Sequence, residues 1–354
     1  MIIRCLYALL LFPLTAFCCT DFLISTTDRT HINGRSMEFG YVFQPSIVVH
    51  PRGEKITSQA PNQQPGMSWT SNYGYVGLFD QADQFLDGFN ENGLSVGALW
   101  LPSSRYPDVS KQSNSQIVSY MDFPLWILGN FTSIDDLKPH LENVYVYAYK
   151  VPVFNEIPPI HLAIHDAEGK SLVIEFIDGK MQVYDNPIGV LTNDPPFPWQ
   201  VTNLNNYINL SAVNAKSATF DGTVLGGAGQ GTGLLGIPGD WTPPSRFVRI
   251  ALFKNFLERP MNAKAGAIAA IHLLNTVDIP FGGVRSSQNK ATDFTQWVVI
   301  KDLTNKVLYY RTYSDPNVQS FELLSKDVEV GAKPIKIQIP LELVEPPHLQ
   351  QVEQ

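Results

Sequence analysis

Three cysteines lie close together at the amino-terminal end of the sequence, and their positions carry its clearest chemical signal. They are Cys5, Cys18 and Cys19, and no cysteine follows them in the 354 residues. Cleavage after Cys18 would leave one cysteine, as the first residue of the mature chain, so that an intrachain disulfide would be impossible. Such a residue joins a thiol to an α-amine that has a pKa of about 8 and can act as a base. The pattern predicts an N-terminal nucleophile at Cys19.

This kind of nucleophile depends on groups supplied by the rest of the chain. A nearby cation favours the thiolate, an anion orients the amine, and fixed hydrogen-bond donors stabilise a tetrahedral oxyanion. The fold must therefore bring basic, acidic and amide side chains to the start of the mature chain.

The segment before Cys19 has the features of a secretory signal. Arg4 is its one charge, an apolar run too short to span a membrane follows, and the small residues Ala16 and Cys18 precede the cut. We expect residues 1–18 to be a signal peptide and residues 19–354 to form a single catalytic domain. The mature protein would then be secreted or periplasmic. No later stretch is long enough to span a membrane.

Composition and charge narrow the class of partner. Hydrophobic residues make up 44% of the chain and charged residues 16%, which is typical of a globular protein. The formal net charge of −8, without a basic cluster, argues against nucleic acid and anionic membranes as partners. His161 and His165 are four residues apart within a strand pattern, which is not a zinc-binding spacing. We expect no metal, no cofactor and a small-molecule substrate.

The pattern of apolar residues predicts blocks of strands alternating with blocks of helices. Turn residues at 168–169 and 178–179 divide residues 160–185 into three strands of an antiparallel meander. This order predicts an α+β sandwich of two antiparallel sheets with helices outside. The other expected strands cover residues 20–26, 35–41, 73–79 and 93–101 and a hairpin at 295–314, and the expected helices cover 121–131, 133–144, 246–260 (capped by Ser245) and 262–277.

Two short motifs are typical of other classes of protein, but the secondary structure expected around each motif does not fit that class. Gly93 to Gly97 spells G-x-S-x-G around Ser95, yet it lies between a turn and a strand rather than between a strand and a helix. Gly231 to Gly236 spells G-x-G-x-x-G, but prolines follow where a helix would have to begin. We therefore do not predict a serine hydrolase or a dinucleotide-binding protein.

Several segments together point to one family. Cys19-Thr20 is followed sixteen residues later by Arg35, within Gly34-Arg35, and Glu38 lies three residues beyond. Asn193 lies in LTNDP, Arg246 ends the string PGDWTPPSR, and Trp100 ends DGFNENGLSVGALW. From Cys19 to about Tyr313 this order resembles the choloylglycine hydrolases, which comprise bile salt hydrolases and penicillin V acylases. The resemblance implies a four-layer αββα fold of the N-terminal-nucleophile hydrolases.

The resemblance also implies roles for these residues. Cys19 would be the nucleophile and, through its amine, the base, while Arg35 and Arg246 would stabilise the thiolate and the developing charge. The Asn193 side chain and the Trp100 backbone N–H would donate to the oxyanion.

Two departures from the family pattern affect efficiency and substrate choice. Glu38 replaces the expected aspartate and is one methylene longer. Trp100 replaces an asparagine or a tyrosine, and we expect it to line the acyl pocket with Met37. Conjugated bile salts fit best as substrates, followed by penicillin V and acyl-homoserine lactones. An inactive relative and a lipid-anchored binding module remain as alternatives, and the resemblance allows a dimer or tetramer.

Overall fold

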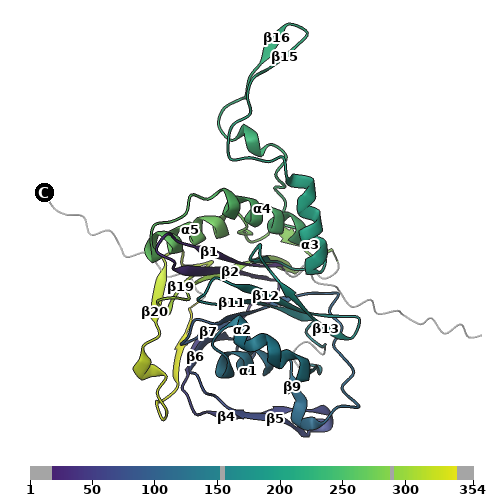
Figure 1. The fold of residues 1–354 in the computed structure, drawn as a ribbon, viewed down its shortest axis with the longest axis vertical. Coiled ribbons are helices and arrows are strands. Elements are labelled where there is room, and N and C mark those ends of the chain that lie inside the picture. The colour runs from purple at the N-terminus through teal and green to yellow at the C-terminus, as the bar shows by residue number, and fades with distance from the viewer. Residues whose placement is uncertain (1–17, 152–155, 288–290, 341–354) are drawn as a thin grey trace, which may run out of the picture.

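The computed structural model describes residues 18–151, 156–287 and 291–340, and two antiparallel sheets form its centre (Figure 1). The first sheet has the order β14 (Val190–Leu191), β1 (Cys18–Ser25), β2 (His31–Phe39), β18 (Thr292–Asp302), β19 (Val307–Thr312), β20 (Gln319–Glu322), with β17 (Val284–Arg285) also on β18. The second has the order β13 (Lys180–Asp185), β12 (Ser171–Ile177), β11 (Ile160–His165), β8 (Ser95–Trp100), β7 (Phe85–Asn90), β6 (Tyr75–Phe79), β3 (Ser46–His50), β21 (Ile335–Gln338).

Helices cover the outer faces of both sheets. On the first sheet, α4 (Pro243–Phe256) packs against β1, and α5 (Ala263–Asn275) packs against β2 and β18, with α3 (Phe197–Asn203) beside α4. On the second sheet, α1 (Phe123–Asn130) packs against β7 and β8, and the single turn α2 (Ile134–Leu137) lies next to it (Figure 1). The chain therefore forms the α+β sandwich that the sequence predicts.

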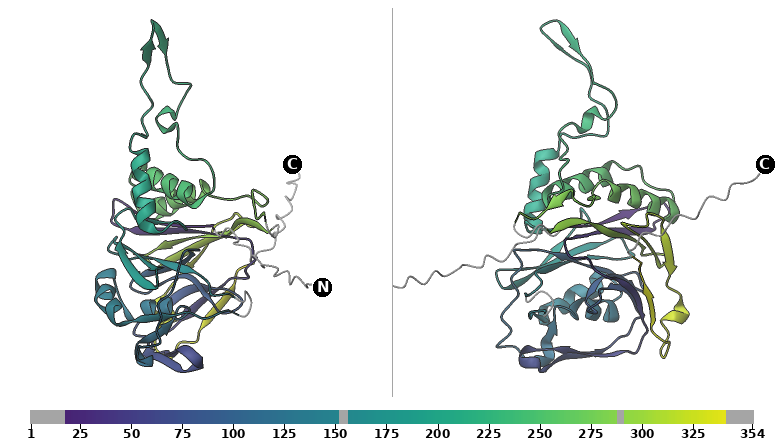
Figure 2. Two further views of the ribbon diagram at one scale, coloured as in Figure 1. Left: turned by 90° about the vertical axis from the view of Figure 1, so that its right-hand side faces the viewer. Right: turned by 180° about the vertical axis from the view of Figure 1, so that it is seen from behind.

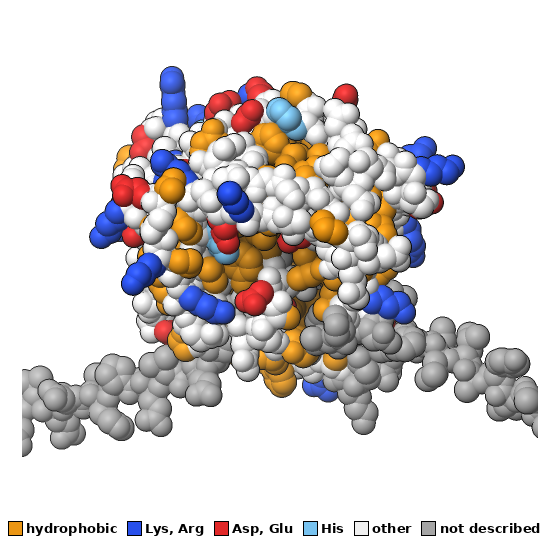
Figure 3. Space-filling model, turned by 90° about the horizontal axis from the view of Figure 1, so that it is seen from below, with side chains coloured by type: hydrophobic (Ala, Val, Ile, Leu, Met, Phe, Trp, Pro, Cys, Tyr) orange, Lys and Arg blue, Asp and Glu red, His pale blue; other side chains and the backbone are white. Residues whose placement is uncertain are grey.

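Smaller elements extend the sandwich at the end where α1 lies (Figure 1). β4 (Lys55–Gln59) and β5 (Pro65–Thr70) form a hairpin beyond α1, and β9 (Ile117–Ser119) and β10 (Tyr145–Tyr147) form a parallel pair. From the end with the β4–β5 hairpin, apolar surface gathers around a hollow in the middle of the face (Figure 3). Short 3₁₀ turns occur at Pro61–Gln63, Asn114–Gln116, Lys138–Asn143, Leu204–Tyr207, Thr232–Leu234 and Ser325–Asp327.

A long segment between α3 and α4 projects away from the body, with the hairpin of β15 (Ala218–Phe220) and β16 (Thr223–Leu225) at its tip (Figure 2). Its apolar side chains have no core to enter, so several are largely exposed: Val213, Phe220, Val224, Leu225 and Leu235. The Gly-rich motif at residues 231–236 belongs to this segment and forms a 3₁₀ turn, not a dinucleotide-binding loop.

The beginning of α4 differs from the prediction. Ser245 does not cap the helix, because the helix already begins at Pro243 and its N-cap residue is Thr242. Prolines are well suited to the first helical turn, where a backbone N–H has no partner within the helix. Ser245 instead donates from its hydroxyl to Asp240 Oδ2 at 2.7 Å and is buried. The N-terminus of α5 is capped by Asn262, which accepts from Ala265 N at 3.0 Å.

The turn before β8 accounts for the glycine that begins the G-x-S-x-G motif at residues 93–97. Gly93 has a φ of +84°, and a Cβ at this position would lie 2.0 Å from the carbonyl oxygen of Leu303. Only glycine fits such a turn. Ser95 begins a strand and donates to Asn33 Oδ1, buried between the sheets, so the motif does not form a nucleophile elbow.

The described residues include no helix that is both long and apolar enough to cross a membrane. Apart from Cys18, the predicted signal peptide lies outside the described residues.

Candidate active site

Cys19 lies in β1 and is almost completely buried between the two sheets, with 2% of its surface exposed. Met37 is directly opposite on β2, and its Sδ atom is 3.8 Å from the Cys19 sulfur. Cys18 precedes Cys19 in the strand, so the nitrogen of Cys19 is a peptide N–H, and it donates to Asn193 Oδ1 at 2.8 Å. The predicted nucleophile and the predicted oxyanion donor are therefore in direct contact.

Arg35 reaches the sulfur from the neighbouring strand. Its Nη2 atom is 4.0 Å from Cys19 Sγ and donates to the carbonyl of Ala98 at 2.6 Å. Its Nη1 atom donates to the carbonyl of Leu86 and lies 3.6 Å from Asp87 Oδ2. These contacts, made while Arg35 is 1% exposed, fix a cation beside the thiol.

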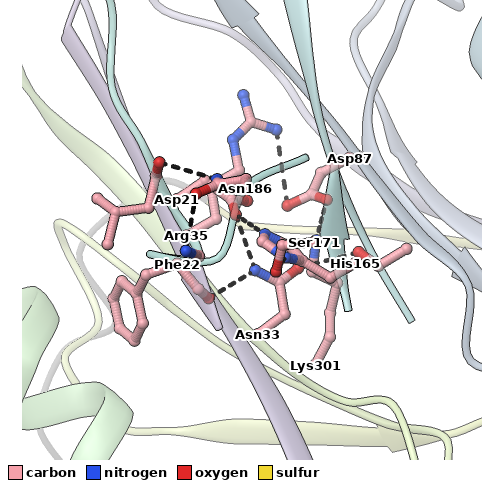
Figure 4. Close-up of polar contacts among 12 residues, drawn as sticks. Asp21, Phe22, Asn33, Arg35, Asp87, His165, Ser171, Asn186 and Lys301 are labelled. Carbon is pink, nitrogen blue, oxygen red and sulfur yellow. Dashed lines mark hydrogen bonds and ion pairs between the residues drawn. The ribbon is translucent and has the colours of Figure 1, made fainter. Parts of the chain in front are cut away.

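A buried polar network surrounds Arg35 (Figure 4). Asp87 also pairs with Lys301, and Asp21, which faces Arg35 in the strand register, accepts from Asn33 at 3.0 Å and contacts His165 at 2.6 Å. Burial alone would raise the pKa of Asp21, but the adjacent His165, with Lys301 and Arg35 nearby, holds that pKa below its ordinary value. Asp21 and Asp87 thus balance the charge of Arg35 and Lys301 in the interior.

Arg246 joins Cys19 to Asn193 from the first turn of α4. Its Nη1 atom donates to the carbonyl of Cys19 and to Thr20 Oγ1 at 2.7 Å, and its Nη2 atom donates to Asn193 Oδ1 at 2.7 Å. The amide nitrogen of Asn193 donates to the carbonyl of Trp100 at 2.7 Å. Because Oδ1 receives two hydrogen bonds and Nδ2 gives one, the orientation of the Asn193 amide is fixed, and one hydrogen of Nδ2 is left for a ligand.

Two opposing effects act on the pKa of the Cys19 thiol. Burial raises the pKa of the thiol above its ordinary value, while the positive charge of Arg35 acts in the opposite direction. Deprotonation of the thiol therefore needs a base close to the sulfur.

Glu38 lies in β2 opposite Cys18, beside the peptide bond that cleavage after Cys18 would break. Its side chain is fully buried, and Oε1 accepts from Thr295 Oγ1 at 3.0 Å. Burial raises the pKa of Glu38 to about 7, although Arg246 and two hydrogen bonds act to lower it. The Glu38 carboxyl group is thus buried close to the Cys18–Cys19 peptide bond.

Trp100 separates two hollows. A small cavity of about 40 Å³ lies at the thiol, and a larger cleft of about 1000 Å³ opens between the β4–β5 hairpin and the segments that follow β8 and β10. Trp100 lines both, and its ring meets Phe39 edge-on at 5.8 Å. The small cavity is also lined by Met37, Phe39, Phe43, Leu86 and Ile160. The structure thus places Trp100 and Met37 on the apolar wall beside Cys19.

The structure brings all seven predicted site residues together, and it adds residues that the sequence pattern did not reveal. Thr20 contacts Arg246, Asp87 pairs with Arg35, and Asp21 faces Arg35 in the strand register. All three are fully buried. The alternation of β1 could have identified Asp21, because it lies on the same face as Cys19. Asp87 gives no such signal, because it comes close to Arg35 only when the two sheets pack together.

The site and the sandwich define a class of enzyme. Residues 19–335 match the family described as linear amide C-N hydrolases, choloylglycine hydrolase family, and the chain belongs to this family. It is therefore a hydrolase of linear amide C–N bonds.

Individual relatives include two types of enzyme. The bile salt hydrolase/transferase of Clostridium perfringens is 33% identical over 319 residues, which are 88% of this chain and 94% of the relative. The penicillin V acylase of Pectobacterium atrosepticum is 25% identical over 336 residues, 88% of this chain and 83% of the relative.

Solved structures show the same likeness. A mutant of the conjugated bile acid hydrolase from Clostridium perfringens superposes with a TM-score of 0.80 at 32% identity, covering 92% of this chain and 98% of that chain. The penicillin V acylase from Agrobacterium tumefaciens, at 24% identity, has a TM-score of 0.74 over 90% of each chain and shares the fold.

The raised pKa of Glu38 predicts a pH-dependent loss of stability in the chain that retains Cys18. The unfolded carboxyl ionises near its ordinary pKa of 4.5, whereas the folded one stays protonated up to about 7. The wild type should therefore lose stability relative to Glu38→Gln as the pH rises through this interval, by about 3 kcal/mol at most. Urea unfolding of both uncleaved proteins at about pH 5 and about pH 8 measures the difference. Equal pH dependence would show that Glu38 is ionised throughout.

Proposed function

We propose that the protein hydrolyses conjugated bile salts at their amide bond, with Cys19 as the nucleophile. The observation that carries this proposal is the convergence of Cys19, Asn193 and Arg246, in which one amide oxygen contacts the nucleophile's own nitrogen and an arginine. Support for the substrate comes from relatives named bile salt hydrolase/transferase and conjugated bile acid hydrolase.

In the proposed mechanism, the α-amine of a cleaved chain removes the thiol proton, and the sulfur attacks the carbonyl carbon of the substrate. Arg35 stabilises the thiolate from 4.0 Å. The carbonyl oxygen becomes an oxyanion, which accepts from the remaining hydrogen of Asn193 Nδ2 and from the Trp100 backbone N–H. The protonated amine of Cys19 then passes its proton to the leaving nitrogen, and the C–N bond breaks. Water attacks the resulting thioester, which releases the carboxylic acid and restores the thiol.

The space around Trp100 supports a substrate with a large acyl group. The cleft of about 1000 Å³ has the size of a small-molecule site, whereas the cavity at the thiol is too small for more than the reacting bond. Trp100 lies where the two meet, so an acyl group in the cleft would lie against its ring. Penicillin V is a second candidate, because the edge-on pair of Trp100 and Phe39 forms an aromatic wall suited to an aromatic acyl group.

Replacing Cys19 by serine tests the proposed reaction. An alkoxide is much harder to form than a thiolate beside the same weak base, so we expect Cys19→Ser to lose nearly all release of glycine or taurine from conjugated bile salts. The variant should keep the circular dichroism spectrum and melting temperature of the wild type. Wild-type turnover by the serine variant would place the nucleophile elsewhere, and an inactive but folded wild type would contradict the proposed substrate.

Replacing Trp100 by asparagine tests its proposed place on the acyl wall. Loss of the ring should change the ratio of kcat/KM for conjugated bile salts to kcat/KM for penicillin V, because the two acyl groups differ in shape and would lose different contacts with the ring. Phe43→Leu changes the same small cavity without touching the border of the large cleft and serves as the matched control. If Trp100→Asn and Phe43→Leu change this kcat/KM ratio by the same factor, the specificity depends on other segments.

We also propose that the protein is exported and that cleavage between Cys18 and Cys19 is its activation step. While Cys18 is attached, the nitrogen of Cys19 is an amide without a basic lone pair. Cys18 itself lies opposite Glu38, beside the site. The signal-like segment at residues 1–18 supports export, whether to a periplasm or to the outside.

This proposal predicts the mass and the activity of the exported chain. Intact-mass measurement should give a polypeptide that begins at Cys19 without an attached lipid. An uncleavable variant that retains residues 1–18 should fold but show no hydrolysis, since the base is missing. Strong activity from a protein whose mass proves it uncleaved would exclude the amine as the base.

Homo-oligomer formation is a further part of the proposal. The segment that ends in the β15–β16 hairpin projects from the body and exposes apolar side chains, among them Phe220 and Val224 (Figure 2). Burial of such side chains against a second copy would remove them from water.

A further inference from the structure

The segment that carries Asn193 has little regular structure of its own. β14 ends at Leu191 and α3 begins at Phe197, so Asn193 lies in a five-residue connection between them. Side-chain contacts of Asn193 set the orientation of its amide, but the position of its backbone depends on what holds this connection.

Two side chains of the opposite sheet hold both ends of the connection. His161 Nε2 lies 3.0 Å from the carbonyl oxygen of Thr192, immediately before Asn193. Glu175 Oε1 accepts from the backbone N–H of Phe197 at 2.9 Å, at the start of α3. The two side chains contact each other, since His161 Nδ1 is 3.0 Å from the same Glu175 oxygen.

The chemistry of this pair makes it rigid. His161 and Glu175 are neighbours on β11 and β12, and neither side chain is exposed to solvent. The ring of His161 faces a carbonyl oxygen on one side and a carboxylate oxygen on the other, and both are acceptors. Both ring nitrogens of His161 are therefore engaged, one by the Thr192 carbonyl and the other by Glu175. Hydrogen bonds of this kind are strong when they are buried.

We propose that His161 and Glu175 are positioning residues that hold the 192–197 segment so that the Asn193 amide points at the reacting carbonyl. Neither residue touches the thiol or the substrate cavity in the described contacts, so their effect would pass through Asn193. A displacement of about 1 Å at an oxyanion donor can lower turnover about 100-fold. The inference rests on the proposed role of Asn193 in the oxyanion site.

Two substitutions at His161 separate positioning from simple loss of a buried side chain. His161→Asn can keep a donor at the place of Nδ1, near Glu175, but loses the contact with Thr192. His161→Gln can keep a donor at the place of Nε2 and so retain that contact. We expect His161→Asn to lower kcat about 10- to 100-fold with little change in KM, and His161→Gln to retain most of the activity. A purely structural role would make the two variants equally poor.

A double-mutant cycle with Asn193→Ala tests whether the effect passes through Asn193. Asn193→Ala alone should lower kcat about 100- to 1000-fold. If His161 acts through Asn193, adding His161→Asn to this variant should change kcat no further. His165→Asn is the matched control, because His165 lies on the same face of β11 but contacts Asp21 and Ser171, so its effect should add to that of Asn193→Ala.

All kcat values are normalised to the amount of Cys19 that iodoacetamide alkylates in the folded protein, which removes differences in folding yield. Unchanged kcat for His161→Asn, or an effect that adds fully to Asn193→Ala, would overturn the positioning role. If Asn193→Ala itself retained normal kcat, the oxyanion role of Asn193, and with it the inference, would be wrong. If His161→Asn does not fold, Glu175→Gln enters the same cycle with the same expectation.

Discussion

A single buried oxygen, Oδ1 of Asn193, joins the three parts of the chain on which the site depends. It accepts one hydrogen bond from the nitrogen of Cys19 in β1 and another from Arg246 in α4. These segments are far apart in the sequence, and the same oxygen also fixes which way the amide nitrogen of Asn193 points. The position of the donor and the position of the nucleophile are therefore set by one shared contact rather than by two independent ones.

The second constraint is the burial of charge between the sheets. Arg35, Asp87 and Lys301 are almost completely removed from solvent, and isolated charges in such a place would be very unfavourable. They are tolerated because each has a partner of opposite sign and because carbonyl groups of β7 and β8 accept from the arginine. This arrangement leaves the guanidinium little freedom, so it is oriented toward the sulfur before any substrate arrives.

The sequence predicts those parts of the structure that depend on residues close together in the chain. Alternating apolar residues identify β1, β2, β8 and the β11–β13 meander, and the segments around Arg35, Asn193 and Arg246 identify the family. Contacts formed only when the sheets pack leave no local pattern, which is why Asp87 and Lys301 did not stand out. The same holds for His161, whose spacing from His165 shows a shared face but not a contact with Thr192. The predicted helix at 246–260 leaves out Pro243 and Pro244, which begin α4.

The hydrogen bond between the Cys19 nitrogen and Asn193 exists while Cys18 is still attached, and this has a consequence for timing. If the chain is cleaved after Cys18 as proposed, the surrounding groups are already assembled when the terminal amine forms, and cleavage changes the chemical nature of one nitrogen without rearranging its neighbours. In such a precursor the side chains of the site are already in place, and only the free α-amine is missing. The delay between synthesis and activity would then equal the time taken to cut one peptide bond, with no slow rearrangement added to it.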